Sequence, residues 1–371
     1  KMTQGSNALY NYKQIIGGEK HFRQFFPQLD VNIDSDIRKA YRGGFTYLNP
    51  KFAGKLIKEN GFVIDYNSLY PSVMLMKPLP YSQPVFFQGQ YEYDRYYPIY
   101  IQHLRAQFTV KKGHIPTIQL KNNLSFIANE YITDSGFEYP DLYLTNVDLC
   151  LFYEHYDVYN IEFIDGWKFR AQKGMFDKYI NKWSKVKVES KLQGNKGMTL
   201  IAKLLLNSLY GKFGTSPKGR SKKPVLENGI LKFEKLEEEE RKSVYIPCAV
   251  FITAWARNET IRMAQKIHET GKYIYSDTDS IHAIGDIPDF IPLDNAKLGY
   301  WKHEFNIKYC KYLRQKCYVD YGTEPNSNKL ERNITVAGLP KSAKKSFTIK
   351  KFNIGSVYSG KLQPKQVKGG V

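Results

Sequence analysis

The chain has 371 residues and a formal net charge of +19, an excess that favours a polyanionic partner, with nucleic acid the commonest candidate. Hydrophobic residues make up 42% of it, which is enough for globular cores, and its length predicts two or three domains or subdomains. The four cysteines form no Cys-x-x-Cys pair, so we expect neither a zinc site nor a disulfide framework. The longest apolar stretch, residues 245–256, is too short to span a bilayer, and we expect a soluble cytoplasmic protein without a signal peptide.

Strand-like runs dominate residues 41–165, and one of them ends in an acid. In the segment FVIDYNSLYPSVM, residues 62–74, the β-prone run Phe62 to Ile64 leads directly to Asp65. A strand-end aspartate is commonly a cap or a turn residue. It could instead bring a carboxylate to a site that is completed elsewhere in the chain.

A helical stretch is predicted for residues 175–210, and its last part, TLIAKLLLNSLYGKFG at 199–214, is strongly apolar with Gly211 as a natural stop. Lys203, Asn207 and Tyr210 fall at i, i+4 and i+7, so they share one face of the helix. That face is either an ordinary solvent stripe or a surface on which the lysine grips a phosphate while the tyrosine packs against a flat ring.

The next stretch, Gly211 to Pro224, is basic and rich in Gly, Ser and Pro, so it is predicted to be an exposed loop. The acidic run EKLEEEER follows it and should face solvent. A second helix is predicted for about 250–270. At the end of the chain, residues 341–371 carry eight lysines and no acid, which is typical of a solvated tail or a phosphate-binding surface.

Residues 273–281, YIYSDTDSI, place two aspartates at the tip of an apolar β-prone run. Side chains at i and i+2 of a strand share a face, so Asp277 and Asp279 can point at one place, and two like charges that close require a cation. A solvated hairpin turn is the alternative. A calcium loop is disfavoured because the Gly and final Glu that it needs are absent, and carboxylates two residues apart suit a glycosidase poorly.

Three segments together resemble a known family. DYNSLYPS, KLLLNSLYG and YSDTDS are similar, in order and spacing, to motifs A, B and C of B-family DNA polymerases. YRGGF at 41–45, AVFITAWAR at 249–257, LGYWKHE at 298–304 and KYLRQKCY at 311–318 resemble the protein-primed branch of that family, the phage phi-29 type. The resemblance covers essentially the whole chain.

The resemblance implies an α+β right-hand polymerase with palm, fingers, thumb and two family-specific insertions. Its expected divisions are a palm at 1–76 and 243–335, a terminal-protein-docking insertion at 77–174, fingers at 175–214, a second insertion for strand displacement and processivity at 215–242, and a thumb at 336–371. It also implies phage or plasmid-type DNA replication by a monomer, with primer-template DNA, deoxynucleoside triphosphates and a priming terminal protein as partners.

The site that the resemblance implies uses two Mg²⁺ ions, which Mn²⁺ can replace. Asp65, the backbone carbonyl of Tyr66 and Asp279 would be the metal ligands, and Asp277 the assisting third catalytic acid. The implied nucleotide-binding residues are Tyr70, Lys187, Lys203, Asn207 and Tyr210, with Tyr70 under the sugar. The implied DNA-binding residues are Tyr41, Arg42, Gly43, Gly44, Ser68, Gly211, Thr253, Arg257, Lys316, Tyr318, Lys341, Lys344 and Lys345.

Two departures from the family pattern carry expectations of their own. Thr199 stands where a second helix lysine is expected, one turn before Lys203, and Lys196 is a candidate substitute. The chain contains no Asp-x-Glu, the motif of the exonuclease domain that precedes the polymerase in the family, so we expect no 3′ trimming activity. The alternatives are a reverse transcriptase or RNA polymerase palm, which the Lys-x-x-x-Asn-Ser-x-Tyr-Gly segment disfavours, and a catalytically weak nucleic-acid-binding fragment of a longer polymerase.

Overall fold

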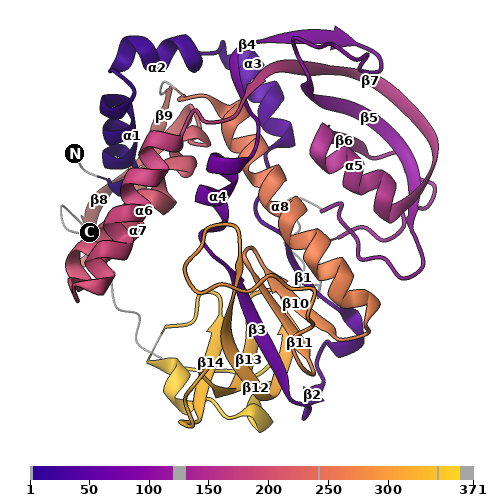
Figure 1. The fold of residues 1–371 in the computed structure, drawn as a ribbon, viewed down its shortest axis with the longest axis vertical. Coiled ribbons are helices and arrows are strands. Elements are labelled where there is room, and N and C mark those ends of the chain that lie inside the picture. Colours follow the sequence, from indigo (N-terminus) through magenta and orange to yellow (C-terminus); the bar gives the residue numbers. More distant parts are fainter. Residues whose placement is uncertain (1–2, 120–130, 241–242, 341, 360–371) are drawn as a thin grey trace.

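In the computed structural model of the chain, the structure describes residues 3–119, 131–240, 243–340 and 342–359. Three antiparallel sheets and two groups of helices make up these residues (Figure 1). In this described part of the chain, no helix is both long enough and apolar enough to cross a bilayer.

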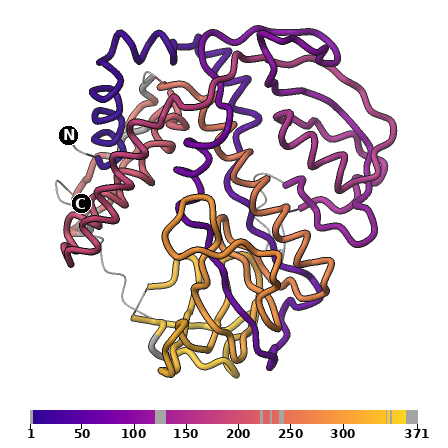
Figure 2. The backbone as a smooth tube through the Cα atoms, in the orientation of Figure 1, coloured from indigo at the N-terminus to yellow at the C-terminus, as the bar shows by residue number. Residues whose placement is uncertain are grey.

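The central sheet joins segments that lie far apart in the sequence. Its strands run in the order β1 (Thr46–Leu48), β10 (Tyr273–Asp277), β11 (Ser280–Ile284), β3 (Gly61–Tyr66), β12 (Trp301–Arg314), β13 (Cys317–Thr323) and β14 (Glu331–Val336), and β2 (Leu56–Ile57) pairs with β12. Every pairing is antiparallel. As a result β3 lies between strands from the last third of the chain, as the trace in Figure 2 shows.

Helix α8 (Ile246–Glu269) packs against β10 and β11 and is buried along most of its length. It begins four residues earlier than the sequence indicates, because Pro247 occupies the first turn, where a missing N–H costs nothing. The short helix α4 (Leu69–Met76) follows β3 directly and packs on α8.

Three α-helices and a 3-10 turn occupy most of residues 4–40, a segment for which the sequence predicted no element. Helices α1 (Gln4–Ile15), α2 (Glu19–Phe25) and α3 (Val31–Ile37) precede the short 3-10 turn η1 (Arg38–Ala40). Buried aromatic residues anchor the first two: Tyr12 of α1 stacks on Phe176 at 4.9 Å between ring centroids. A second 3-10 turn, η2 (Pro50–Phe52), follows β1.

The second sheet is built only from residues 79–172, inside the expected first insertion. Its order is β4 (Leu79–Gln88), β7 (Tyr156–Gln172), β5 (Ile99–Val110) and β6 (Asp141–Thr145), with α5 (Asn146–His155) against it. It has a small hydrophobic core of its own around Leu104, Phe108 and Phe152.

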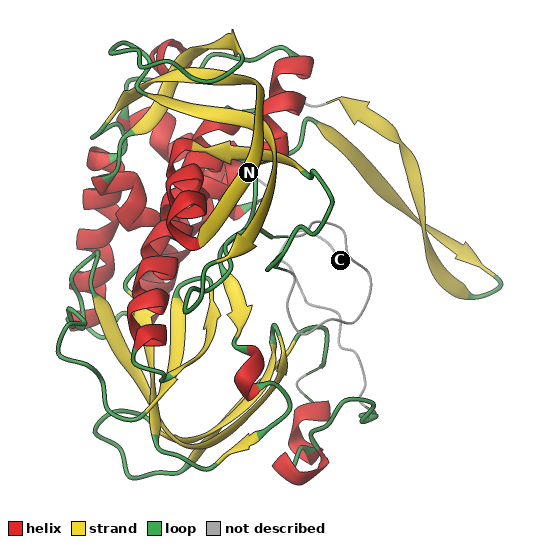
Figure 3. Cartoon of the chain, turned by 90° about the vertical axis from the view of Figure 1, so that its right-hand side faces the viewer, coloured by secondary structure: helices red, strands yellow, loops and turns green. Residues whose placement is uncertain are grey.

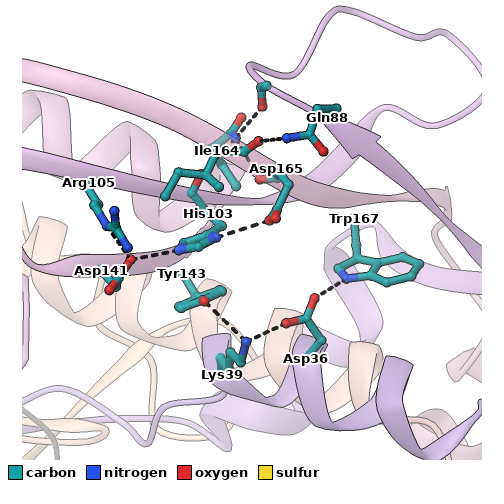
Figure 4. A network of polar contacts seen from close by, with 12 residues as sticks. Asp36, Lys39, Gln88, His103, Arg105, Asp141, Tyr143, Ile164, Asp165 and Trp167 are labelled. Carbon is teal, nitrogen blue, oxygen red and sulfur yellow. Dashed lines mark hydrogen bonds and ion pairs between the residues drawn. The ribbon is translucent and has the colours of Figure 1, made fainter.

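Polar contacts tie the second sheet to the end of α3 (Figure 4). The Trp167 indole N–H donates to Asp36 at 2.6 Å, and Asp36 forms an ion pair with Lys39 at 2.8 Å. Lys39 also donates to the Tyr143 hydroxyl at 3.3 Å, and the Tyr143 ring stacks on His103. The insertion is therefore fixed to the N-terminal segment by side chains as well as by the chain itself.

Helices α6 (Asp177–Leu192) and α7 (Lys196–Phe213) form an antiparallel hairpin that lies beside α1 (Figure 1). Gly211 does not end α7, as the sequence had suggested; the helix continues to Phe213, whose buried ring holds the last turn, and Gly214 follows as its C-cap. The expected apolar cover is also incomplete, since Leu200 and Ile201 are about half exposed.

The predicted basic loop is in fact half of a hairpin. Strands β8 (Lys218–Glu227) and β9 (Ile230–Glu240) pair only with each other and project from the body of the molecule (Figure 3). Asn228 and Gly229 both have positive φ, which is typical of a two-residue hairpin turn. The basic strand lies opposite the acidic one: Lys223 is in register with Glu234, and the Lys218 ammonium lies 4.0 Å from a Glu238 carboxylate oxygen, so the two charge runs offset each other across the hairpin.

After β14 the chain forms two short 3-10 turns, η3 (Ala343–Ser346) and η4 (Ile349–Lys351). Phe347 and Phe352 are buried there against Leu313 and Val319 of the central sheet. The described part of the expected thumb is thus small and rests on the last strands of the expected palm.

Candidate active site

Asp65 and Asp279 lie together at one end of the central sheet. Asp65 is in register with Ser280 across the β3–β11 pair, and the Tyr66 N–H donates to the Asp279 carbonyl at 2.7 Å. Both carboxylates are partly buried, and burial raises the pKa of Asp65 to about 7, with Asp279 and Glu304 acting in the same direction. Burial, and after it the charge of Asp277, also raises the pKa of Asp279.

Asp277, the third acid, is paired with the cation of Lys316. The Lys316 ammonium forms an ion pair with one carboxylate oxygen, and the Tyr275 hydroxyl donates to the other at 3.3 Å. Among the residues that the structure describes, no three His, Cys, Asp or Glu side chains are grouped so that they could hold one metal ion. The site thus offers two carboxylates, Asp65 and Asp279, with Asp277 in a supporting position.

The turn between the two motif-C acids is fixed by the YRGGF segment. Thr278 has a positive φ of 63°, and its N–H donates to the Phe45 carbonyl at 2.7 Å. A Cβ on Gly44 would lie 2.6 Å from the Thr278 methyl carbon, so only glycine allows this approach. The Thr260 hydroxyl donates to the Thr278 carbonyl at 2.7 Å from the other side, and the turn is held between two elements.

Beside the two carboxylates is a cavity of about 540 Å³, which we call the lysine-rich cavity. Helices α4, α6 and α7, strand β12 and the loop before it supply its walls. Its lining residues are Asp65, Asn67, Ser68, Leu69, Tyr70, Pro71, Lys187, Lys191, Thr199, Lys203, Asn207, Tyr210, Asp279, Asn295, Lys302 and Glu304. All five residues that the resemblance implied for nucleotide binding are among them.

The tyrosines of the lysine-rich cavity form one unit. The rings of Tyr70 and Tyr210 stack with centroids 4.0 Å apart and planes 23° from parallel. Burial raises the pKa of both phenols, so they are neutral hydrogen-bonding groups at neutral pH. On the opposite side Lys187 donates to the Ser68 hydroxyl at 3.2 Å, and burial lowers the pKa of that ammonium.

Several lining residues were not singled out from the sequence. Lys191 lies one helical turn after Lys187, a spacing that could have identified it. Asn295, Lys302 and Glu304 come from β12 and from the loop before it, segments with no obvious link to the helix hairpin in the sequence. Ser68, expected at DNA, instead lines this cavity and accepts the Lys187 hydrogen bond.

Three of the residues expected at DNA lie on the other side of the motif-C turn. Gly43, Gly44 and Lys316 line a second cavity of about 340 Å³ together with Thr278 and Arg314. This cavity carries two basic side chains, Arg314 and Lys316, next to backbone that is exposed by the glycines. The arrangement suits a phosphate backbone that approaches the carboxylates from this side.

Thr253, Arg257 and Tyr318, which were also expected at DNA, have buried side chains that contact other parts of the protein. All three are less than 10% exposed. Thr253 donates to carbonyls of its own helix, and Tyr318 packs against Tyr275 and Tyr312 behind the sheet. Arg257 bonds Asp148 at 2.8 Å and the carbonyls of Arg42 and Gly43 at 3.1 and 2.9 Å, so it holds the YRGGF segment in place.

The remaining expected DNA contacts are scattered. Tyr41 lies against Gly214 at the end of α7, and Gly211 is exposed on the same helix. Lys344 donates to the Ile334 carbonyl at 2.6 Å, which commits its ammonium to the protein. Lys341 lies outside the described residues, and so does the side chain of Lys345.

The donor set fits a divalent metal. Two adjacent carboxylates with raised pKa values are hard oxygen ligands of the kind that Mg²⁺ prefers, and the backbone carbonyl of Tyr66, the residue after Asp65, is an oxygen of the same kind. Their mutual repulsion is relieved only by a cation or a proton, and neither Asp65 nor Asp279 is recorded in a side-chain ion pair among the described residues.

Comparison with known proteins gives consistent matches. Residues 1–289 match the family described as DNA polymerase type B, organellar and viral. The whole chain is 47% identical to the DNA polymerase of Bacillus phage B103, 46% to that of Bacillus phage phi29 and 35% to that of Streptococcus phage Cp-1. It covers 66%, 66% and 65% of those proteins, respectively.

A solved structure is similar over nearly the same span. The phi29 DNA polymerase in complex with primer-template DNA and incoming nucleotide substrates superposes with a TM-score of 0.89 at 45% sequence identity. The match covers 96% of this chain and 63% of that one, so the chain spans less than two thirds of the length of these relatives.

Proposed function

The chain belongs to the type B DNA polymerases of organelles and viruses, and from this premise we propose that it adds deoxynucleotides to a primer 3′-hydroxyl under the direction of a DNA template. One observation carries the proposal: Asp65 and Asp279 meet at the wall of a cavity that also presents four lysines and a stacked tyrosine pair. A triphosphate needs cations along its length and a flat contact for its base, and this cavity offers both.

The reaction is an in-line displacement in which the primer oxygen bonds the α-phosphorus and pyrophosphate leaves. Bound Mg²⁺, or Mn²⁺ in its place, would lower the pKa of the attacking hydroxyl and neutralise charge on the phosphates. Asp65, Asp279 and the Tyr66 carbonyl are the groups that would hold the metal. The Asp277–Lys316 ion pair keeps the third acid fixed beside them and sets a positive charge at the edge of the second cavity, where the primer would lie.

The lysines and tyrosines of the cavity position the nucleotide. Lys203 and Lys187 face the space beside the carboxylates, and a lysine is suited to a phosphate as a compact point charge. Asn207 lies one helical turn after Lys203 and supports the same face. Tyr70 and Tyr210 present their rings where the sugar and base of the new pair would sit, with Tyr70 excluding a ribose 2′-hydroxyl.

We also propose protein-primed initiation, in which a terminal protein presents the first hydroxyl. Its docking surface would be the second sheet, which forms a separate unit within residues 79–172 and exposes Tyr93 and Tyr96. Deleting about residues 77–174 should abolish a covalent protein–nucleotide adduct with the cognate partner and preserve some DNA-primed extension. Adduct formation that survives the deletion would assign this sheet another role.

The finer expectations for palm, fingers and thumb boundaries, a monomer, and action in the host cytoplasm stand as part of the same proposal. The alternative is a DNA-binding fragment with little or no catalysis. Both alternatives predict DNA binding, so binding alone does not distinguish them.

A primer-extension assay tests the proposal. The purified chain, a DNA hairpin with a recessed 3′ end, four deoxynucleotides and Mg²⁺ should give products lengthened to the end of the template. Omitting Mg²⁺ or adding a chelator should stop extension and leave the hairpin bound. Binding without any extension, in Mg²⁺ and in Mn²⁺, would favour the inactive fragment.

A further inference from the structure

We propose that Lys302 binds the phosphates of the incoming nucleotide and of the pyrophosphate product, and so replaces the helix cation that is missing at Thr199. This inference rests on the proposed polymerase function and concerns one residue of the same site. Neither the sequence motifs nor the comparisons assign Lys302 a role.

The position of Lys302 follows from the central sheet. It lies on β12 directly opposite Asp65 of β3, and Glu304 is two residues further along the same strand. The β3–β12 register shifts between His303 and Phe305, at Glu304, and the side chains of Lys302 and Glu304 both line the lysine-rich cavity. About a third of the Lys302 side chain is exposed, and the residue lines the cavity.

The charge of Lys302 is close enough to Asp65 and Lys187 to affect the pKa of both groups. Burial and Asp279 raise the pKa of Asp65, and Lys302 opposes that rise more than Lys203 does. Burial lowers the pKa of Lys187, and Lys203 and Lys302 are among the charges that lower it further. Cations that repel one another in this way are arranged for an anion that is to occupy the space between them.

Thr199 leaves a gap in the phosphate-facing side of α7. It lines the cavity one turn before Lys203, but its hydroxyl donates to the Asn195 carbonyl at 2.8 Å within its own helix. Lys196, the substitute that the sequence suggested, is exposed at the start of α7 and does not line the lysine-rich cavity. Lys302 supplies a positive charge to the same cavity from the facing strand.

Glu304 holds Lys302 in place without nucleotide. The ammonium and a carboxylate oxygen of Glu304 are 2.6 Å apart. A triphosphate carries more negative charge than one carboxylate, so it would compete for the ammonium when it enters. The pair thus keeps the cation oriented and prevents an uncompensated positive charge in the free protein.

Lys302 also stands where the lysine-rich cavity meets another. An adjoining cavity of about 660 Å³ shares Lys191, Asn295, Lys302 and Glu304 with it. A phosphate group bound at Lys302 is therefore at the passage between the two cavities. The adjoining cavity also carries the carboxylates of Asp294, Glu304 and Glu324, so Lys191 and Lys302 are the cations that would hold a phosphate at this boundary.

The experiment measures nucleotide affinity without chemistry. Each protein is bound to a primer-template whose primer ends in a dideoxynucleotide, and the Kd of the next correct dNTP is measured in Mg²⁺ by stabilisation of the complex against competitor DNA. Lys302→Met, which keeps the length and removes the charge, should raise the Kd about tenfold, as expected for loss of one charge-assisted contact. Lys302→Arg should remain within about threefold of the wild type.

A second substitution, on the facing helix α7, distinguishes a lost phosphate contact from a structural effect of the Lys302 substitution. In Lys302→Met, adding Thr199→Lys should recover most of the lost affinity, and the inhibition constant of pyrophosphate should follow the same order across the variants. Lys308→Met is the matched control, because Lys308 is an exposed lysine of the same strand, and its Kd should not change.

Two results would overturn the inference: an unchanged Kd in Lys302→Met, or a loss that neither Lys302→Arg nor Thr199→Lys restores. The wild-type protein in the same assay reports on the proposed function separately. If it forms no nucleotide-dependent complex, the polymerase proposal falls together with this one; if it does and Lys302→Met behaves identically, only the role of Lys302 is wrong.

Discussion

Tyr70 and Tyr210 stack face to face in the wall of the lysine-rich cavity, with ring centroids 4.0 Å apart. Tyr70 comes from α4 and is followed by Pro71, which lies in the first turn of that helix, while Tyr210 comes from α7. Each ring restricts the rotamers of the other. A stacked ring that cannot move aside is suited to excluding an extra hydroxyl by steric contact.

Replacing Tyr70 by Val should therefore weaken discrimination against ribonucleotides. Loss of a steric penalty of about 1–3 kcal/mol raises ribonucleotide incorporation roughly tenfold or more, and incorporation of deoxynucleotides should change much less. The measurement is kcat/KM for dGTP and rGTP. The control is Tyr210→Phe, which keeps the stacked ring, removes its hydroxyl and should retain discrimination. If an active Tyr70→Val enzyme shows an unchanged ratio of kcat/KM for dGTP and rGTP, Tyr70 does not exclude the ribose hydroxyl.

The buried pair Asp148–Arg257 should contribute strongly to stability. It joins α5 to α8 with three hydrogen bonds of 2.8 to 3.1 Å, and Arg257 then reaches the carbonyls of Arg42 and Gly43. Asp148→Ala leaves the arginine charge buried without its partner, which costs about 3–5 kcal/mol of unfolding free energy. Denaturant unfolding measures this loss.

The same two helices provide a control. Glu154 of α5 and Arg262 of α8 form an ion pair at 2.8 Å, but both side chains are more than 40% exposed. Glu154→Ala should cost about 1 kcal/mol or less, because solvent screens this pair. Equal losses in the two variants would contradict the different roles assigned to the buried and the exposed pair.

The raised pKa of Asp65 predicts a stability change with pH in metal-free protein. Below about pH 4 the Asp65 carboxyl is protonated in both the folded and the unfolded chain. Between pH 4 and the folded pKa of about 7, only the unfolded chain ionises at this residue. The free energy of unfolding therefore falls as the pH rises through this range. Asp65→Asn removes this cost. With a chelator present, the variant should be more stable than the wild type at pH 8, by roughly 4 kcal/mol at most, and the gain should vanish at about pH 4.

Added Mg²⁺ should reverse the order at pH 8, since it stabilises a folded wild type that can bind it and does little for Asp65→Asn. Thermal unfolding with and without the metal measures both effects. If Asp65→Asn were less stable than the wild type at pH 8 with a chelator present, the pKa of Asp65 in the folded protein would not be raised.

The local motifs were readable from the sequence because chemistry and spacing coincide in them. Asp277 and Asp279 at i and i+2, and Lys203, Asn207 and Tyr210 at one helical face, required only local geometry, and each of these five residues lies at or beside the site. The apolar runs likewise predicted the second-sheet strands and helix α8. In contrast, Gly211 failed as a helix stop because the buried Phe213, a tertiary contact, carries α7 onward.

Local spacing could not identify residues that reach the site only through the order of strands in the central sheet. Lys302 reaches the cavity only because β12 pairs with β3, and nothing within a few residues of Lys302 announces that pairing. In the basic segment at 211–224, which was predicted to be a loop, the part from Lys218 onward is a strand because it pairs with the acidic run that follows it. Thr253, Arg257 and Tyr318 were expected at DNA by position in a motif, but their burial makes them supports of the site.

The central claim is that Asp65 and Asp279 together hold the metal that drives nucleotide transfer. The most direct measurement is the single-turnover rate of nucleotide addition to a bound primer-template by the wild type, Asp65→Asn, Asp279→Asn and Asp277→Asn. The first two substitutions should each lower the rate by on the order of 10³-fold or more, as loss of several kcal/mol of transition-state stabilisation requires, with DNA affinity nearly unchanged. Asp277→Asn should lower it less, because Lys316 and Tyr275 already hold that carboxylate. Near-normal rates in both Asp65→Asn and Asp279→Asn would contradict the claim.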